Sequence, residues 1–358
     1  MLKYLELFNE IKSKILSGTY KASSILPTEM DLVGQYKVSR TTVQKALDLL
    51  VKEGFIVRYP GKGSFVAENQ QQYTENITPA GVNKTFALLL PNKRQTMFNV
   101  MTGTQKYLEN SGCELIINFN NYNDSDEVSI VANLIKRKVD GVILYPLHTS
   151  DMVYKQLVEN NIAVVTIDKQ INRIPTNNVS TNDYEGGYTA ARFLIQCGHR
   201  DITLFTTPIS GMSTLTARLN GFCDCLKDNG IAINKDRFYI LSNWNSSEYD
   251  DITRYFKRSR LPDAIFCSCD EVAARAYKVM HDLNISIPGD VSMIGYDNLE
   301  FTEFIAPPLT TIEQPYFSIG EHAARILLGI FDSPGSTISR ILLPPKLIVR
   351  NSVKVVTA

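Results

Sequence analysis

The chain has 358 residues, of which 44% are apolar, and its 37 basic and 37 acidic side chains leave no formal net charge. This length suggests two or three units that each bury a hydrophobic core. No apolar run reaches the ~18 residues of a membrane span, and the N-terminal stretch is charged throughout, unlike a signal peptide. We therefore expect a cytoplasmic protein without a membrane anchor.

The six cysteines, at positions 113, 197, 223, 225, 267 and 269, give no sign of a metal site. Their two C-x-C pairs lack the C-x-x-C spacing and the neighbouring His of common zinc sites. Cys267 and Cys269 fall in the apolar run AIFCSC, where small buried thiols are the usual outcome. We expect no metal and no cofactor, and a reducing compartment.

The chain opens with an amphipathic stretch in which Tyr4, Phe8, Ile11 and Ile15 recur at helical spacing. Residues 26–50, LPTEMDLVGQYKVSRTTVQKALDLL, then predict two helices joined by a tight corner. Residues 28–31, TEMD, form a capping-box start for the first of them.

The second of these helices is the candidate for DNA recognition. Ser39 can cap it, and Val43, Ala46, Leu47 and Leu50 give it an apolar face. Its other face carries charged and hydrogen-bonding side chains: Arg40, Thr41, Gln44, Lys45, Asp48 and Lys52. Such a helix suits a major groove, where its first turn reaches base edges and phosphates. Any solvated helix has a charged free face, however, so this face alone leaves both interpretations open.

A β-hairpin is predicted next, with strands at residues 55–57 and 64–66 around the turn YPGKG. Lys62 lies between two glycines at its tip. That tip could lie along a DNA backbone or minor groove, or be an ordinary turn. The layout is that of a winged helix-turn-helix. Residues 1–68 hold ten basic and seven acidic side chains, a net charge of +3 that weakly supports a DNA-binding head.

Several motifs in residues 1–68 resemble the GntR-type winged helix: LPTE (26–29), VSRTTV (38–43) and GKGSFV (61–66). The resemblance implies that the turn before the second helix, the face of that helix and the wing tip contact DNA. The residues concerned are Ser39, on a phosphate, and Arg40, Thr41, Thr42, Gln44, Lys45, Lys62 and Gly63. Many members have Arg where this chain has Gln44, and Gln pairs with adenine whereas Arg prefers guanine. The operator preference of relatives therefore does not transfer.

Residues 69–83 are polar and predict a linker. Beyond them, short apolar runs alternate with amphipathic stretches. Strands are expected at 86–91, 114–119, 140–146 and 163–168, and in a second series at 202–207, 238–243, 264–269 and 292–297. Helices are expected at 98–110, 125–137, 151–160, 184–197, 214–229, 247–258 and 271–282. This alternation predicts an α/β fold of two lobes with parallel sheets, and a ligand at the carboxyl ends of the strands.

The polar residues at these strand ends suit a sugar better than a catalytic reaction. Asp168, Arg218, Asp297 and Gln314 offer bidentate partners for hydroxyl groups, and Trp244 can cover a sugar's C–H face. Each has a structural alternative, such as an Asx turn for Asp297, a loop cap for Asp168 and a core position for Trp244. The chain contains no G-x-G-x-x-G after a strand, no Walker loop and no G-x-S-x-G elbow. We expect no enzyme.

Residues 84–358 resemble the LacI/GalR effector-binding body, whose fold is shared with periplasmic sugar-binding proteins. The motifs that carry the resemblance are DYEGG (183–187), GHR (198–200), RLNGF (218–222), DVSMIGYDN (290–298) and PPLTTIEQP (307–315). It implies effector contacts at Arg218, Trp244, Asp297 and Gln314, and through looser motifs at Phe98, Asp168 and Asn182. Leu144-Tyr145 and Cys269 depart from polar contacts seen in some members, which leaves the sugar's identity open.

A GntR-type head on a LacI/GalR-type body resembles the arabinose-responsive repressors. The expected domains are a winged helix at 1–68, a linker at 69–83 and an effector body at 84–358. Lobe 1 of this body is expected at about 84–183 and 314–342, and lobe 2 at about 184–313 and 343–358. The resemblance implies a homodimeric repressor that binds an operator in double-stranded DNA and is released by a sugar. The first candidate for this sugar is L-arabinose. A hexose, a sugar phosphate, a purine or an activator role remain alternatives, as do a transport-type binding protein and a sugar-metabolising enzyme.

Overall fold

The computed structural model describes residues 3–16, 19–21, 24–52, 55–59, 63–66, 84–91, 96–109, 111–121, 123–147, 150–171, 174–208, 213–233, 237–241, 248–258, 260–332 and 337–356. They form two compact units, Met1–Ala80 and Gly81–Ala358, which we call the head and the body.

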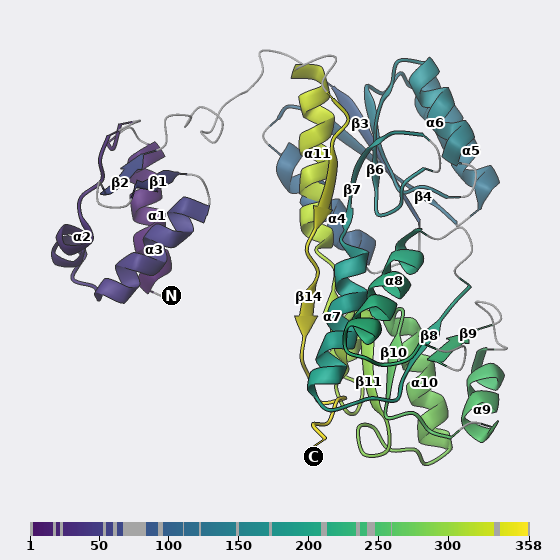
Figure 1. Ribbon diagram of the computed structural model, residues 1–358. Helices are drawn as coiled ribbons and strands as arrows, with labels where there is room; N and C mark the ends of the chain where they lie inside the picture. Colours follow the sequence, from purple (N-terminus) through teal and green to yellow (C-terminus); the bar gives the residue numbers. More distant parts are fainter. Residues whose placement is uncertain are drawn as a thin grey trace. The chain divides into compact units, whose positions relative to one another are not determined.

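The head is a winged helix-turn-helix (Figure 1). It contains α1 (Lys3–Leu16), α2 (Glu29–Tyr36), α3 (Arg40–Lys52), β1 (Ile56–Tyr59) and β2 (Gly63–Val66), and the two strands pair antiparallel. One core joins all three helices to the strands. Its buried residues include Phe8, Ile11, Ile15, Leu32, Val43, Ala46, Leu47, Leu50 and Val66. The apolar faces predicted for the first and third helices are therefore confirmed.

The corner between α2 and α3 follows from local chemistry. Thr28 and Asp31 form the predicted capping box, in which the Asp31 amide donates to the Thr28 hydroxyl and the Thr28 amide to the Asp31 carboxylate. Helix α2 ends where Lys37 adopts a left-handed conformation, with φ of 50°. Two residues later, the Ser39 Oγ accepts the Thr42 amide at 3.2 Å and so caps α3.

The first lobe of the body is a six-stranded parallel sheet. Its strands, in spatial order, are β13 (Arg340–Leu343), β7 (Asn177–Thr181), β6 (Ala163–Ile167), β5 (Gly141–Leu144), β3 (Thr85–Pro91) and β4 (Glu114–Asn120). Helices α4 (Thr96–Leu108) and α11 (Tyr316–Asp332) pack on one face, and α5 (Asp124–Lys136) and α6 (Ser150–Glu159) on the other. Both faces are thus covered, as the continuous apolar strands predict.

The second lobe repeats this plan. Its strands are, in spatial order, β14 (Lys346–Ile348), β12 (Thr310–Glu313), β11 (Ser292–Asp297), β10 (Ala264–Cys267), β8 (Ile202–Thr206) and β9 (Phe238–Ile240), and β14 pairs antiparallel with β12. Helices α7 (Asp183–Gln196) and α8 (Ser213–Asp228) cover one face, and α9 (Glu248–Arg258) and α10 (Asp270–Asp282) the other. A short 3-10 helix, η3 (Glu300–Glu303), follows β11.

The chain passes between the lobes at three connections, from β7 to α7, from β12 to α11 and from β13 to β14. Figure 1 shows the two sheets stacked along the body, with these connections between them. The carboxyl ends of β7 and β12 lie at the first two connections, so both sheets direct their carboxyl ends towards the junction. The two-lobed α/β fold is confirmed.

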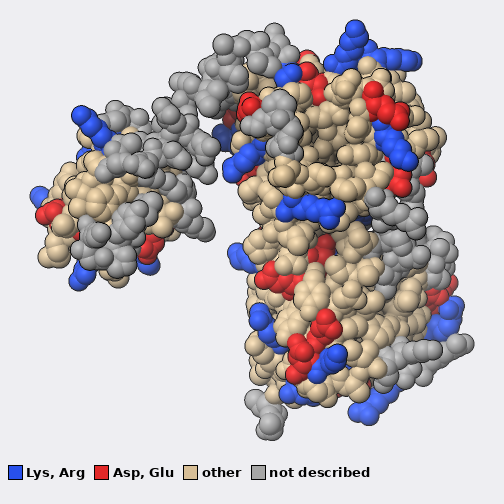
Figure 2. Space-filling view, turned by 45° about the horizontal axis from the view of Figure 1, so that its top comes forward, with Lys and Arg blue, Asp and Glu red and all other residues tan. Residues whose placement is uncertain are grey.

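The surface of the body has no region dominated by one charge on the face drawn in Figure 2, where acidic and basic side chains alternate. All six cysteines are free thiols. None of the helices in the described part of the chain is long and apolar enough to cross a membrane.

Candidate DNA-reading surface and effector cleft

The predicted DNA-contacting residues of α3 lie at the surface of the head. Ser39, Arg40, Thr41 and Lys45 are exposed, and Thr42 is half-buried. The Ser39 hydroxyl lies 2.8 Å from the Thr42 Oγ1 and 3.2 Å from the Thr41 Oγ1. Three hydroxyls thus surround the first turn of α3, where free amides and the helix dipole favour a phosphate.

Glu29 contacts two of these predicted DNA-binding side chains. Its Oε2 accepts a hydrogen bond from Arg40 Nε at 3.1 Å and another from Gln44 Nε2 at 3.2 Å. In the sequence, Glu29 is marked only as a member of the capping-box start TEMD and of the motif LPTE. Its spacing of 11 and 15 residues from the two partners gives no periodic signal, so only the packing of α2 on α3 reveals the contact.

The wing is described only in part. Gly63 is exposed and has φ of 105°, a conformation that favours glycine, and a side chain there would approach Ile25. Lys62 lies outside the described residues, so its predicted place at the wing tip stays a prediction.

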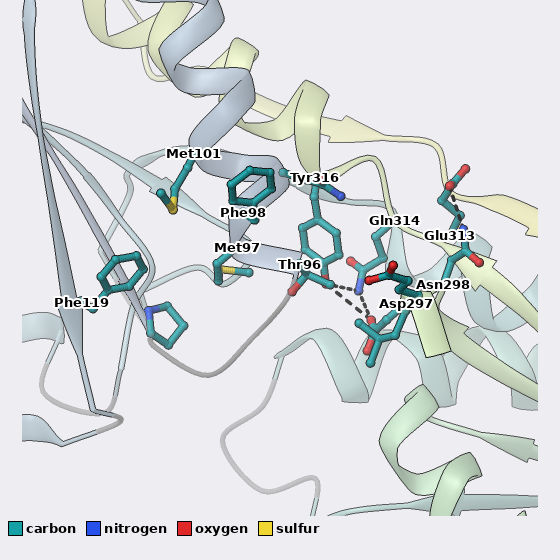
Figure 3. Close-up of a pocket in the computed structure, with 14 residues that line it drawn as sticks. Thr96, Met97, Phe98, Met101, Phe119, Asp297, Asn298, Glu313, Gln314 and Tyr316 are labelled. Carbon is teal, nitrogen blue, oxygen red and sulfur yellow. Dashed lines mark hydrogen bonds between the residues drawn. The ribbon is translucent and has the colours of Figure 1, made fainter. Parts of the chain in front are cut away.

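A cavity of about 600 Å³ lies between the two lobes of the body (Figure 3). Lobe 1 contributes the ends of β3 and β4 and the first turns of α4, and lobe 2 contributes the end of β11 and the start of η3. The described residues that line it are Pro91, Thr96, Met97, Phe98, Asn99, Met101, Phe119, Asp297, Asn298, Leu299, Glu300, Glu313, Gln314 and Tyr316. Three of the predicted effector residues are among them, namely Phe98, Asp297 and Gln314.

Gln314 joins the lobes through a buried hydrogen-bond network. Its Nε2 donates to Asp297 Oδ1 at 2.5 Å and to Tyr316 OH at 2.7 Å, and its Oε1 accepts from Thr181 at 2.7 Å. Thr181 ends β7 in lobe 1, whereas Asp297 ends β11 in lobe 2. Figure 3 shows Gln314, Asp297 and Tyr316 meeting at one side of the cavity. A ligand that bonds to Asp297 or Gln314 would therefore alter a contact between the lobes.

Arg218 lies in a buried cluster in lobe 2 rather than in the described cavity lining. Its Nε donates to Asp183 at 2.6 Å, its Nη1 donates to the Ser268 carbonyl at 2.7 Å, and its guanidinium stacks 3.7 Å from the Tyr296 ring centre. Burial and, to a smaller extent, the charge of Asp168 together raise the pKa of Asp183 to about 6, against the opposing effect of Arg218. This buried carboxyl therefore titrates close to neutral pH.

The other three predicted effector residues are Asp168, Asn182 and Trp244. Asp168 follows β6 with φ of 63° and lies near enough to Asp183 to influence its charge. Asn182 caps α7 by accepting the Glu185 amide at 3.3 Å. Neither is among the residues that line the described cavity. Trp244 lies outside the described residues, so its role stays a prediction.

Thr96 and Tyr316 also line the cavity and were not predicted from the sequence. The Thr96 Oγ1 is buried at the cavity wall and has no hydrogen-bond partner among the described residues, and no periodic signal distinguishes it. Tyr316 follows the predicted Gln314 by two residues, so the same motif could have indicated it.

Residues 3–66 match the family described as bacterial regulatory proteins, gntR family, and residues 191–353 match the periplasmic binding protein-like domain. The arabinose metabolism transcriptional repressor of Halalkalibacterium halodurans is 30% identical, with 98% of this chain and 96% of that protein covered. The chain belongs to this family of GntR-headed transcriptional repressors.

Two further repressors and a solved structure are also similar to this chain. The arabinose metabolism transcriptional repressor of Geobacillus stearothermophilus is 28% identical over 98% of both chains. The HTH-type transcriptional repressor PurR of Glaesserella parasuis is 26% identical over 92% of this chain and 99% of its own. Among solved structures, a LacI family regulator from Enterococcus faecium with bound ribose is 28% identical. It covers 76% of this chain and 100% of its own, with a TM-score of 0.66.

As a member of this repressor family, the chain is a DNA-binding regulator of transcription with a ligand-binding body. The GntR match spans α1 to β2, and the predicted DNA-contacting face of α3 is exposed within it. The cavity lies in the body, at the junction of the two lobes.

Proposed function

We propose that this repressor controls sugar-utilisation genes and leaves its operator when a pentose binds between the lobes. L-arabinose is the first candidate for this pentose. The observation that carries the proposal is the Thr181–Gln314–Asp297 network beside the cavity. The carboxylate of Asp297 and the amide of Gln314 are the paired groups that recognise vicinal hydroxyls. Because the network spans both lobes, a sugar that joins it would favour one arrangement of the lobes.

The described cavity lining favours a neutral polyol. It supplies three carboxylates, from Asp297, Glu300 and Glu313, and no Lys or Arg among the described residues. Carboxylates accept hydrogen bonds from hydroxyls and repel a phosphate. The names of two relatives point to arabinose metabolism, and the ribose-bound regulator also holds a pentose. Hexoses, sugar phosphates and purines remain the alternatives to test.

We further propose a cytoplasmic homodimer that binds its ligand without turnover and contacts two half-sites through Arg40 and the other predicted α3 residues. A dimer places two recognition helices on a near-palindrome. In this proposal residues 1–68 read DNA, residues 69–83 connect, and residues 84–358 bind the sugar and the second subunit.

The test of the ligand is a titration of the full chain with L-arabinose, D-ribose, D-glucose, ribose 5-phosphate and hypoxanthine. Calorimetry gives affinity, operator release gives response, and recovery of unchanged ligand tests for turnover. Binding of a pentose with operator release supports the proposal. If only hypoxanthine or ribose 5-phosphate released the operator, that compound and not a pentose would be the effector. If the sugar were consumed, the protein would be an enzyme.

The test of the DNA contact is Arg40→Ala. We expect operator affinity to fall by tenfold or more, because a charged contact in the first turn of α3 is lost, while sugar affinity stays as in the wild type. The measurement is a fluorescence-anisotropy titration of labelled operator. Unchanged operator affinity would remove Arg40 from the reading surface.

A further inference from the structure

Glu29 forms hydrogen bonds to two side chains of the proposed DNA-reading surface at once. A single oxygen, Oε2, accepts from Arg40 Nε and from Gln44 Nε2. The Glu29 side chain is 27% exposed, against 68% for Arg40, so the acid lies behind the cation that it holds. Glu29 is the first residue of α2, and both partners belong to α3.

The contact fixes which way the Gln44 amide faces. A free glutamine amide can flip and exchange its donor and acceptor ends. A flipped Gln44 would place its carbonyl oxygen against the Glu29 carboxylate, which is repulsive. In the bonded orientation, Nε2 keeps a second N–H and Oε1 keeps its lone pairs. That donor–acceptor pair matches the N7 and N6 groups of adenine in the major groove.

The contact also limits how Arg40 binds DNA. Its Nε is occupied by Glu29, so the terminal nitrogens remain for a base or a phosphate. Glu29 also places a negative charge beside the DNA, which opposes attraction to phosphates at any sequence. A group that weakens binding to all DNA and orients the base-reading side chains raises the preference for the correct site.

We propose that Glu29 is a positioning residue that determines operator specificity, by orienting Gln44 and restraining Arg40 at a cost in overall affinity. This inference rests on the proposal that Arg40 and Gln44 contact DNA. It predicts an operator with adenine at the base that Gln44 reads, and a repressor that binds random DNA weakly.

The experiment compares full-length wild type, Glu29→Gln and Glu29→Ala. Operators are first selected from random DNA with the wild type, and Kd is then measured for the selected site, its single-base variants and unrelated DNA over a range of salt. We expect both variants to bind unrelated DNA several-fold more tightly. We expect discrimination at the base read by Gln44 to fall by about tenfold, the scale of one bidentate contact.

Glu10→Gln is the matched control. It removes the same charge from the same unit, but Glu10 pairs with Lys14 on α1, and no contact with Arg40 or Gln44 is found among the described residues. A second control is Glu29→Ala combined with Gln44→Ala, in which Glu29 should no longer affect discrimination at that base. Thermal unfolding of each variant verifies the fold of the head.

The inference is overturned if Glu29→Ala changes affinity for operator and unrelated DNA by the same factor, or if Glu10→Gln reproduces its effect. A different failure belongs to the proposed reading surface. If Arg40→Ala and Gln44→Ala themselves leave operator binding unchanged, α3 does not read DNA through these residues and Glu29 has nothing to position.

Discussion

At the residue scale, a substitution at Thr96 is expected to lower ligand affinity without lowering the stability of the free protein. The Thr96 hydroxyl is buried at the cavity wall without a hydrogen-bond partner in the described part of the chain. A buried hydroxyl without a partner is costly in the free protein unless a ligand supplies the hydrogen bond. We expect Thr96→Val, which keeps the shape, to leave the free protein as stable or slightly more stable. Sugar affinity should fall several-fold, by about 1 kcal/mol for one neutral hydrogen bond.

Calorimetry with the identified sugar and thermal unfolding without it measure the two effects of Thr96→Val separately. Thr102→Val serves as a comparison, because Thr102 lies on the same helix, bonds only to backbone carbonyls of α4, and does not line the cavity. An unchanged sugar affinity in Thr96→Val would place the ligand away from α4.

Asp183 gives the body a pH-dependent stability. Its pKa is about 6 in the folded chain, above the ordinary 3.8, because burial opposes its charge. The folded state therefore holds a proton that the unfolded state has released between pH 4 and 6. This contribution is present in full below about pH 4 and is lost as pH rises through 6, at most about 3 kcal/mol.

The measurement for Asp183 is urea unfolding of the wild type and Asp183→Asn at several pH values from 4 to 7. We expect the stability of the wild type relative to the variant to decline across that window. A relative stability that rises with pH would mean that Arg218 holds Asp183 ionised throughout.

At the element scale, a pair of glycines brings two helices together in each lobe. A Cβ on Gly187 of α7 would collide with the Arg218 carbonyl of α8, and one on Gly221 of α8 with the Tyr184 carbonyl of α7. In lobe 1, Gly103 of α4 and Gly320 of α11 are in the same position relative to the partner helix. These four glycines permit backbone contact that no other residue allows.

We expect Gly187→Ala to destabilise the body by about 1–3 kcal/mol, because α7 and α8 must separate. Gly329→Ala is the matched control, since Gly329 lies in α11 with open space around it. There the better helix former should stabilise the body by up to about 1 kcal/mol. Thermal unfolding measures the stability change in both variants. Equal changes would show that helix propensity alone, and not the close approach of α7 and α8, determines the effect of replacing a glycine.

Much of this element order is predictable from sequence, and the exceptions have physical causes. The eight apolar runs from residue 86 to 297 all contain or overlap strands. Six of these strands are buried along most of their length, whereas β4 and β9 are only partly buried because they lie at the edges of their sheets. Strand β7, NNVST, was not predicted because its buried Asn178, Ser180 and Thr181 resemble a loop. Hydrogen bonds such as Asn178 to Thr166 satisfy these polar groups, and local sequence does not reveal them.

The candidate site was predictable where a strand end or a motif marks it. Asp297 and Gln314 line the cavity as expected, because parallel strands bring their carboxyl ends together. Thr96 and Glu29 were not predicted. The role of Thr96 depends on the cavity wall and that of Glu29 on the neighbouring helix α3, and neither contact leaves a periodic pattern in the sequence. Arg218 was expected from its place after a strand and from the family resemblance, but it is held by Asp183 and Tyr296 and is not in the described cavity lining.

At the scale of the whole molecule, sugar and operator must oppose each other equally. If a saturating sugar weakens operator binding by some factor, saturating operator must weaken sugar binding by the same factor. We expect a factor of 5–150, the usual range of such coupling. Calorimetric titration of sugar into the free repressor and into its operator complex measures one arm, and anisotropy with and without sugar measures the other. Unequal factors would reveal a further species, such as a larger assembly.

The three connections between the lobes also affect the order in which the parts of the protein can fold during synthesis. The head is one continuous stretch at the start of the chain, whereas lobe 1 needs α11 and β13, from residues 316–343. Helix α11 supplies Tyr316, Ile319, Ala323, Ala324 and Leu327 to the core of that lobe. During synthesis the head can fold while the sensor is still incomplete. A chain cut short before α11 would therefore retain the DNA-reading helix without a finished sensor, and any DNA binding that it kept would no longer respond to the sugar.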